Sequence, residues 1–285
     1  MWSRGGIEGA ARGINRSGGR SGGAGAARLC RLSSLPKTGA MPLLDNPEPP
    51  PASLKWRLPP IHPDGRKFMV ASAAIMLVFF WVLDWPMFGW LMAGVTRWIA
   101  AFFRDPVRTT PTGRGLVIAP ADGMVTMIAT VAPPRELAGS DGLGNDPVIR
   151  VSIYMSMFDC HVIRTPVEGM VERVAYVQGK LVNPQFDKAS EDNEREHMMV
   201  EAPNGQRIGF TLIAGVIGRR IVSWVGEGEP VVAGQRVAMI RFGSRTDVYL
   251  PAGTSSQVLL GQRTVAGETI LARLGVAELI EGVAQ

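Results

Sequence analysis

Val148–Met155 reads VIRVSIYM, and this stretch decides the fold class. Its apolar and polar residues alternate with the two-residue period of a strand, so one face is apolar while Arg150 and Ser152 lie on the other. The chain from Leu116 onward is made of similar short runs separated by Gly, Pro, Asn and Asp, which predicts further strands. These runs cover residues 123–131, 206–213, 220–225 and 235–242.

A faint internal repeat supports a small β architecture. Residues 228–240 (GEPVVAGQRVAMI) can be laid over residues 261–273 (GQRTVAGETILAR), with Val-Ala-Gly in common. Each copy predicts a β-hairpin, in which a Gly turn joins two strands. The expected fold is mainly β: a compact β-sandwich or barrel, related to barrel-sandwich hybrids, over residues 105–285.

Two apolar runs precede the β region. Residues 68–83 contain no charged residue, and a second run follows Asp84 and is interrupted by Arg97 alone. Each run is near the lower limit of about 17 residues for a membrane-crossing helix. Residues 67–104 therefore predict a helical membrane hairpin, formed by two tight spans or by a re-entrant pair, with a buried core hairpin as the alternative. Basic residues flank both outer ends, which predicts a cell (inner) membrane location with the β domain on the cytoplasmic side.

The N-terminal residues carry most of the positive charge. Residues 1–40 hold seven Lys/Arg and one acid, which leaves −1 for the remainder of a chain whose formal charge is +5. Nucleic acid is therefore not an expected partner of the body. Residues 1–45 predict a disordered tail, and residues 46–66 a proline-rich linker. We favour an over-extended start with Met41 as the true first residue; a transit peptide is the alternative.

Cysteine usage limits the chemistry of the site. Cys30 lies in the tail and Cys160 in the body, so the chain can form neither a disulfide framework nor a cysteine-based zinc site.

A Gly-Ser pair near the C-terminus is informative because of the sequence strings that accompany it. Residues 241–251 read RFGSRTDVYLP, and a Gly-Ser pair alone indicates only a turn. Four further strings lie upstream. They are FFRDP with PVRTTP (102–111), APADG (119–123), MSMFDCHVIRTP (155–166) and LVNPQFDKASEDNERE (181–196). In this order the strings resemble the phosphatidylserine decarboxylase family, in its short (type A or archaeal-like) form, over roughly residues 60–275.

The resemblance implies that the chain cuts itself between Gly243 and Ser244. The Ser244 hydroxyl attacks the Gly243 carbonyl, which a glycine leaves open to approach. Elimination from the resulting ester divides the chain into a β chain, 1–243, and an α chain, 244–285. The two fragments are expected to stay together as a heterodimer, and a dimer of heterodimers is left open. Ser244 becomes a pyruvoyl group, the cofactor that converts phosphatidylserine in the membrane to phosphatidylethanolamine and CO2. The resemblance implies no metal and no exogenous cofactor.

His161 and Asp122 are the candidate catalytic partners of Ser244. A serine hydroxyl needs a base to take its proton, and a further group usually orients that base. The chain has three histidines, and His62 precedes the apolar runs, so His161 is the candidate base and also the candidate proton donor in decarboxylation. The plain alternatives are a hydrogen-bonded structural histidine and a turn aspartate.

One position departs from the longer bacterial enzymes of the family, in which this motif resembles His-x-x-His. Arg164 takes the place of the second histidine here. Either His161 performs both tasks or His197 assists, with a solvated histidine at a strand edge as the alternative for His197. Arg164 is a candidate ligand for the lipid carboxylate or phosphate, with an ordinary ion pair as the alternative.

Two other functions stay open at this point. The Gly-rich repeat is similar to biotinyl or lipoyl carrier domains, and Asp187-Lys188-Ala189 looks like their modified tripeptide, which would make Lys188 a tethering site. The remaining alternative is an inactive, uncleaved relative that acts as a membrane scaffold, with Arg164 in its favour.

Overall fold

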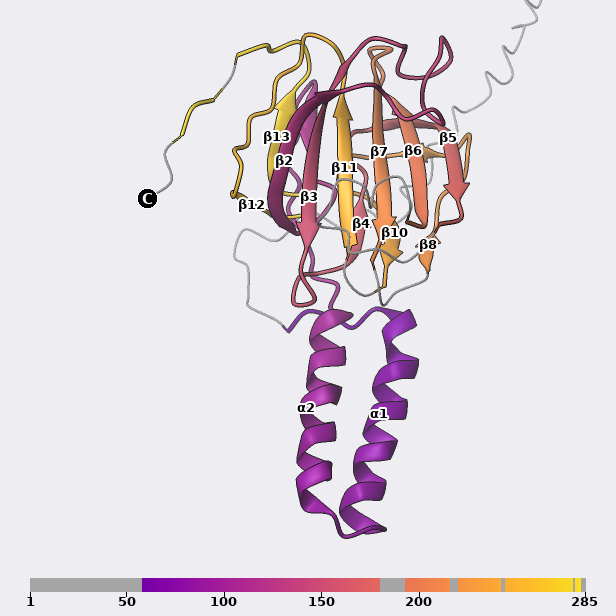
Figure 1. Cartoon of the computed structure of the whole chain (residues 1–285), viewed down its shortest axis with the longest axis vertical. Helices are drawn as coiled ribbons and strands as arrows, with labels where there is room; N and C mark the ends of the chain where they lie inside the picture. Colours follow the sequence, from indigo (N-terminus) through magenta and orange to yellow (C-terminus); the bar gives the residue numbers. More distant parts are fainter. Residues whose placement is uncertain (1–57, 180–192, 216–219, 242–243, 279, 283–285) are drawn as a thin grey trace, which may run out of the picture. The chain divides into compact units, whose positions relative to one another are not determined.

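The computed structural model describes residues 58–179, 193–215, 220–241, 244–278 and 280–282. Within these residues two helices come first, and all the strands follow them along the chain (Figure 1).

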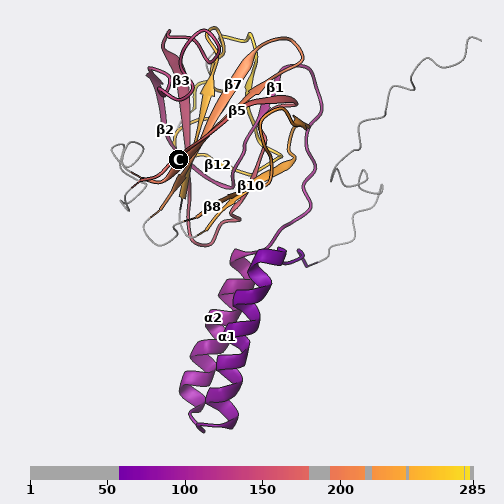
Figure 2. The same cartoon turned by 90° about the vertical axis from the view of Figure 1, so that its right-hand side faces the viewer.

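The two helices form an antiparallel hairpin. α1 (Pro63–Trp81) and α2 (Pro86–Phe102) lie side by side (Figure 1), and Figure 2 views the same pair from the side, with the helices overlapping. Each begins with a proline in its first turn, where a missing amide costs no helical hydrogen bond. Asp84 has a φ of +51° in the short turn between them. The two helices overlap the residues, 67–104, for which a membrane hairpin was expected.

The hairpin exposes many large apolar side chains. Trp81 is 84% exposed, Met87 75% and Trp90 73%. Neither helix in the described part of the chain combines the length and the apolar character that crossing a bilayer requires.

An eight-stranded antiparallel sheet forms the body of the β domain and curls into a half-barrel (Figure 1). Register shifts in β2 and β5 mark bulges, which increase the twist of a strand. In spatial order its strands are β12 (Arg263–Thr264), β2 (Gly123–Val131), β3 (Val148–Met155), β11 (Ser244–Leu250), β7 (Arg207–Ala214), β6 (Arg195–Glu201), β5 (Gly169–Val177) and β9 (Pro230–Val231).

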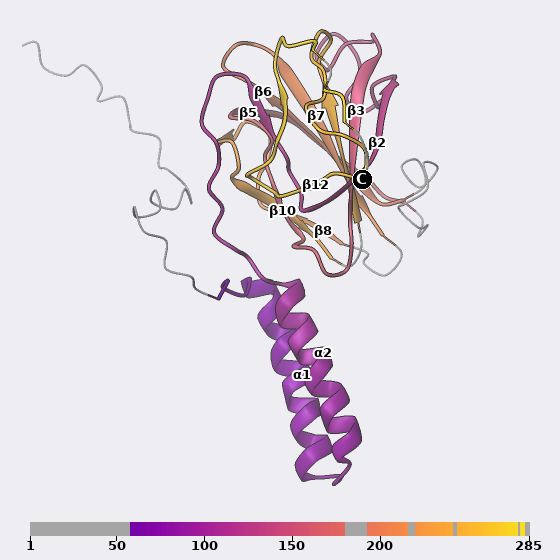
Figure 3. The same ribbon diagram turned by 90° about the vertical axis from the view of Figure 1, so that its left-hand side faces the viewer.

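Two smaller sheets cover the concave side of the large one. A three-stranded sheet contains β4 (Val162–Arg164), β10 (Arg236–Ile240) and β8 (Ile221–Ser223), and β1 (Leu116–Ile118) pairs with β13 (Ile270–Arg273). Apolar residues of the large sheet, such as Ile153 and Val248, pack with Ile163 and Ile240 of the three-stranded sheet in one core, and Figure 3 shows β8 and β10 on this side. The mainly β class is confirmed.

The repeated segments do not form the two hairpins expected from the sequence. β9 pairs with β5 and β12 with β2, whereas β10 pairs with β4 and β8, and β13 with β1. The turns themselves match, since Gly234 and Gly267 both have a φ of +77°. Each turn carries the chain from an edge of the large sheet to a small sheet, because this crossing buries the apolar residues of β10 and β13 in the core.

The structure contains a second pair of similar segments, which lies outside the repeat found in the sequence. Residues 119–123 (APADG) and 165–169 (TPVEG) each lead into a nine-residue strand with a bulge, β2 and β5. Backbone hydrogen bonds join the segments, from Arg164 to Pro120 (2.9 Å) and from Ile118 to Pro166 (2.8 Å). This pairing fixes the turn that carries Asp122.

Candidate active site

Ser244 is the first residue of β11 and lies between the ends of two other strands. It is paired with Met155, the last residue of β3, and with Ala214, the last residue of β7. Its side chain faces the core and is completely buried, with Oγ 3.6 Å from the Met155 sulfur. Gly243, the other half of the expected cleavage site, lies outside the described residues.

Asp122 is held at the same end of the sheet. It directly precedes β2, and Met124 of β2 is paired with Tyr154, next to Met155. One carboxylate oxygen of Asp122 accepts a hydrogen bond from Arg108 Nη2 at 2.6 Å, and the other accepts the Ala266 amide at 2.7 Å. These two donors fix the position of the carboxylate.

His161 is buried in the connection from β3 to β4. Its Nδ1 lies 2.9 Å from the Asp159 carbonyl oxygen, and an Nδ1–H that donates there makes Nε2 the acceptor nitrogen. Burial lowers the pKa of His161 to about 4, although Asp159 opposes the shift, so the imidazole is neutral at pH 7. A buried, neutral imidazole of this kind is suited to accept a proton.

The chain connections around His161 and Ser244 run alongside each other. β3 ends at Met155 and β4 begins at Val162, while β10 ends at Ile240 and β11 begins at Ser244. Met155 is paired with Ser244 at one end, and Val162 with Met239 at the other. The ends of the two connections therefore lie beside each other on the same two sheets. His161 belongs to one connection, and the expected cleavage bond is at the end of the other.

Asn193 and Glu194 reach the site from the fourth string. The Asn193 side-chain amide donates to the Ala214 carbonyl at 2.8 Å, and the Ala214 amide donates to the Glu194 carbonyl at 2.9 Å. Ala214 is the strand partner of Ser244. All five strings thus meet at one end of the large sheet, since Arg108 of the first string binds Asp122, whereas Lys188 lies outside the described residues.

Comparison with known proteins agrees with this convergence. The family model described as phosphatidylserine decarboxylase matches residues 95–272, more than half of the chain. The chain belongs to the phosphatidylserine decarboxylase family.

The chain matches three relatives in this family over nearly their whole length. The phosphatidylserine decarboxylase proenzyme of Novosphingobium aromaticivorans is 53% identical over 81% of this chain and 93% of that protein. The proenzyme of Erythrobacter litoralis is 50% identical over 85% of this chain and 98% of that protein. The proenzyme of Zymomonas mobilis is 52% identical over 78% of this chain and 90% of that protein.

In this family member the three predicted catalytic residues converge but do not form a hydrogen-bonded chain among the described residues. Asp122 binds Arg108 and Ala266, and the Nδ1 of His161 faces Asp159 rather than Asp122. Asp159 is itself fixed, because its carboxylate accepts from the Ser156 amide at 2.9 Å and is bound by Arg263. Asp159 and Arg108 are therefore site residues that sequence reasoning missed, although both lie within the quoted strings.

Arg164 is buried in a cage of backbone oxygens. It donates to the Gly234 carbonyl at 2.8 Å and to the Pro106 carbonyl at 3.1 Å, and Asp105 lies 3.7 Å from its Nη2. This placement favours the ion-pair alternative over a role as a lipid ligand.

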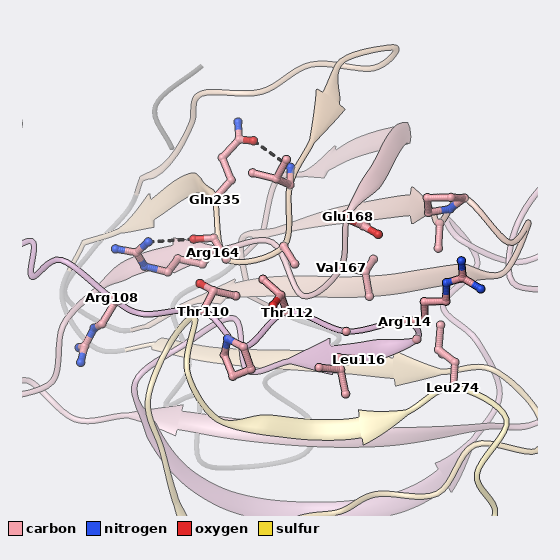
Figure 4. Close-up of a pocket in the computed structure, with 18 of the residues that line it drawn as sticks. Arg108, Thr110, Thr112, Arg114, Leu116, Arg164, Val167, Glu168, Gln235 and Leu274 are labelled. Carbon is pink, nitrogen blue, oxygen red and sulfur yellow. Dashed lines mark hydrogen bonds between the residues drawn. The ribbon is translucent and has the colours of Figure 1, made fainter. Parts of the chain in front are cut away.

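A cavity of about 960 Å³ lies beside Arg164 (Figure 4). Residues 107–116 form one wall, and the turn around Gly234 forms another. Ser244, His161 and Asp122 are absent from its lining. The cavity is therefore separate from the convergence point of the family strings, although Arg108 borders both.

His197 lies on the opposite face of the large sheet from Ser244. It is paired with Thr211, which is paired with Asp247, and Asp247 faces away from the core that Ser244 faces. Its Nδ1 lies 2.8 Å from Thr211 Oγ1, and its Nε2 accepts from Arg195 Nε at 3.2 Å. Both ring nitrogens are thus engaged away from the site.

A metal site was not expected from the sequence. In the described stretches no cluster of three or more His, Cys, Asp or Glu side chains is arranged to hold a metal ion.

Proposed function

We propose that the chain cleaves itself between Gly243 and Ser244 and then, with the pyruvoyl group formed from Ser244, decarboxylates phosphatidylserine to phosphatidylethanolamine and CO2. The convergence of the family strings on Ser244 is the observation that carries the proposal, together with relatives named phosphatidylserine decarboxylase proenzyme. Decarboxylation of phosphatidylserine is the activity of this family member.

Self-cleavage begins with the Ser244 hydroxyl. His161 takes the hydroxyl proton, Oγ attacks the Gly243 carbonyl carbon, and the acyl group moves from nitrogen to oxygen. The buried position of His161 supports this role, because its lowered pKa keeps the ring neutral. Removal of the Ser244 α-proton then expels the ester as a carboxylate on Gly243. Residue 244 is left as dehydroalanine, and water converts it to a ketone with release of ammonia.

The surroundings of Ser244 fit a pyruvoyl group. The side chain is small and completely buried, and its oxygen lies against the Met155 thioether rather than an acid or a cation. Among the described residues, the Ser244 oxygen has no hydrogen bond to a charged side chain that would compete with the substrate amine. The group supplies an electrophile for that amine and a sink for the electrons left by departing CO2.

The residues around Ser244 have separate tasks in this scheme. Decarboxylation consumes one proton per turnover, and His161 relays a proton taken up from solvent to the carbon that has lost CO2. Asp122, fixed by Arg108, holds the turn ahead of β2 against the end of β3 and so maintains the position of Met155 beside Ser244. Asn193 holds the Ala214 side of the same site. We assign Arg164 a structural role.

Complete burial of Ser244 has a consequence for the substrate. A lipid headgroup cannot reach residue 244 in the uncleaved chain, because no surface of that residue is exposed. We therefore infer that the new chain end at Gly243 moves aside after cleavage while the two fragments remain associated through the strand pairs of β11 with β3 and β7.

The helical hairpin is proposed as the membrane anchor. Its outward-facing apolar side chains suit insertion into one leaflet as a re-entrant pair, at a cell membrane with the β domain on the cytoplasmic side. Phe158 is 74% exposed on the loop that carries His161, and an exposed aromatic ring there supports the proposal that the active site itself contacts lipid. Membership of the short form of the family is proposed from Arg164, which takes the place of the second histidine of the longer bacterial enzymes.

The test measures CO2 released from phosphatidylserine labelled in the serine carboxyl group, in vesicles mixed with purified protein. Wild-type protein should release CO2, and Ser244→Ala should release none. Release by Ser244→Ala at the wild-type rate would refute the proposal, as would absence of release by wild-type protein that has been cleaved. The carrier alternative has no support from the repeats, whose strands do not pair as hairpins.

A further inference from the structure

The base of the helical hairpin contacts both connections of the candidate active site. Phe102, the last residue of α2, stacks on the His161 ring with centroids 4.1 Å apart and planes inclined by 29°. Phe102 is 2% exposed, so this contact is dry. The Cys160 thiol, next to His161, also donates to the Arg104 carbonyl at 3.1 Å. The end of α2 thus forms one wall of the histidine pocket.

The start of α1 contacts the segment that leads to the cleavage bond. Arg241 lies two residues before Gly243, and its guanidinium carbon lies 5.7 Å from the centre of the Phe68 ring. The Asp64 carboxylate lies 3.9 Å from the same guanidinium. A cation above an aromatic face, with an acid beside it, is held in place by electrostatic attraction.

The two contacts are joined through the hairpin by a row of aromatic rings. Phe68 stacks on Phe103 at 5.6 Å, and Phe103 packs edge-on against Phe102 at 5.0 Å. The row therefore runs from Arg241 through three phenylalanines to His161. Gly65 allows the helices to close here, since a Cβ on this residue would lie 2.3 Å from the Phe103 Cβ.

We propose that the base of the hairpin is a positioning element for self-cleavage: Phe102 orients His161, and Phe68 with Asp64 holds Arg241. This inference rests on the proposed function. The hairpin accordingly does more than bind the protein to lipid, because the same residues that end its helices set the geometry of the base and of the bond it acts on. Displacing either helix end should slow the cleavage step.

The groups that face His161 set its pKa, so the pH dependence of the cleavage rate can test the proposal. Asp159 on its own loop favours the charged ring, Arg104 beyond α2 disfavours it, and Phe102 excludes water. A smaller side chain at position 102 would admit water and raise the pKa of His161 toward its ordinary value. The acid limb of the cleavage rate should then move to higher pH while the variant is still folded at that pH, which a loss of stability alone would not cause.

The test uses full chains made by cell-free translation with vesicles, pulse-labelled and followed by denaturing electrophoresis. Phe102→Leu should slow appearance of the small fragment at least about tenfold, as expected for a displaced catalytic group, and shift its acid limb upward. Phe102→Tyr, which keeps the ring, should restore most of the rate and the wild-type limb. Phe80→Leu is the matched control, since Phe80 packs on Trp90 near the other end of the hairpin.

Two glycines provide a second pair. Gly65→Ala places a methyl group against Phe103, whereas Gly94→Ala in α2 has no atom within 4 Å. Both changes favour helix, so slower cleavage in Gly65→Ala alone would reflect displacement at the base rather than helix loss. If Phe102→Leu does not fold, the comparison of Gly65→Ala with Gly94→Ala tests the inference. Wild-type cleavage rates in both Phe102→Leu and Gly65→Ala would overturn the inference. So would slower cleavage that matches a fall in melting temperature and leaves the acid limb of the cleavage rate unshifted. Failure of the wild-type chain to cleave refutes instead the proposed function.

Discussion

The carbonyl oxygen of His161 accepts a hydrogen bond from the amide of Ile240 at 3.2 Å. Ile240 ends β10, and the chain reaches Ser244 four residues later. The candidate base is therefore fixed to the same stretch of backbone that it is proposed to cut. This bond ties the two connections together between the sheets, and it explains how a histidine far from Ser244 in sequence reaches the cleavage region.

Replacing His161 tests its role as the base. His161→Gln keeps a polar side chain but cannot take the serine proton, so self-cleavage should slow about 100-fold or more. In the wild-type chain the cleavage rate should fall only at low pH, near the pKa of about 4, because the ring is neutral above it. Pulse-labelled chain incubated across pH 4–8 measures both effects. An acid limb near pH 6.5 would contradict the buried, neutral state.

Asp122 tests the support of the site rather than the proton transfer. Asp122→Asn keeps one acceptor for the Ala266 amide but loses the ion pair with Arg108. We expect slower cleavage and a loss of roughly 1–3 kcal/mol in the free energy of unfolding, because a partly buried charged hydrogen bond is removed. Urea denaturation and the cleavage assay measure the two. Asp141→Asn, at an exposed loop residue, is the control and should change neither.

His197 provides a pH-dependent test of stability. Burial lowers its pKa to about 4, so the unfolded chain binds the proton first as pH falls from about 6.5 toward 4, and the folded state loses stability over this range. His197→Gln should lose less stability across the same interval and should cleave at a rate within about twofold of wild type, since His197 faces away from Ser244. Melting temperatures at pH 7 and pH 5 provide the comparison. A large loss of cleavage would instead restore His197 as a helper.

Membrane attachment is expected to depend on the exposed face of the hairpin. Trp90 and Leu91 are 73% and 59% exposed. Changing both to Glu should weaken sedimentation with anionic vesicles at least about tenfold, because charged side chains oppose entry into hydrocarbon. The exposed residue Leu58, changed to Glu, is the control outside the helices. Unchanged sedimentation of the double variant would exclude the hairpin as the anchor.

The sequence predicted the strands of the sheet better than their connections. Alternation in Val148–Met155 predicted β3 correctly, because a strand between two layers must place its apolar side chains on the core face. The repeats predicted their Gly turns but not the pairing, since β5, the partner of β9, and β4, one of the two partners of β10, lie far away in the sequence. Pairing across a core leaves no local signal in the chain.

The same limit applies to the site. The strings around Ser244, His161 and Asp122 could be recognised because each is a short local pattern. The stacking of Phe102 on His161 and the bond from Arg108 to Asp122 depend on segments brought together by folding. A Phe at the end of an apolar run and an Arg ahead of a proline turn have many other uses, so their contacts required the structure.

The account depends most directly on what happens to the backbone ahead of Ser244. Intact-mass measurement of the purified protein, beside Ser244→Ala, tests it. We predict that the wild-type sample contains a fragment 244–285 that begins with a pyruvoyl group, and that the variant contains the uncut chain alone. A wild-type protein that stays full length and still releases CO2 from phosphatidylserine would contradict the account.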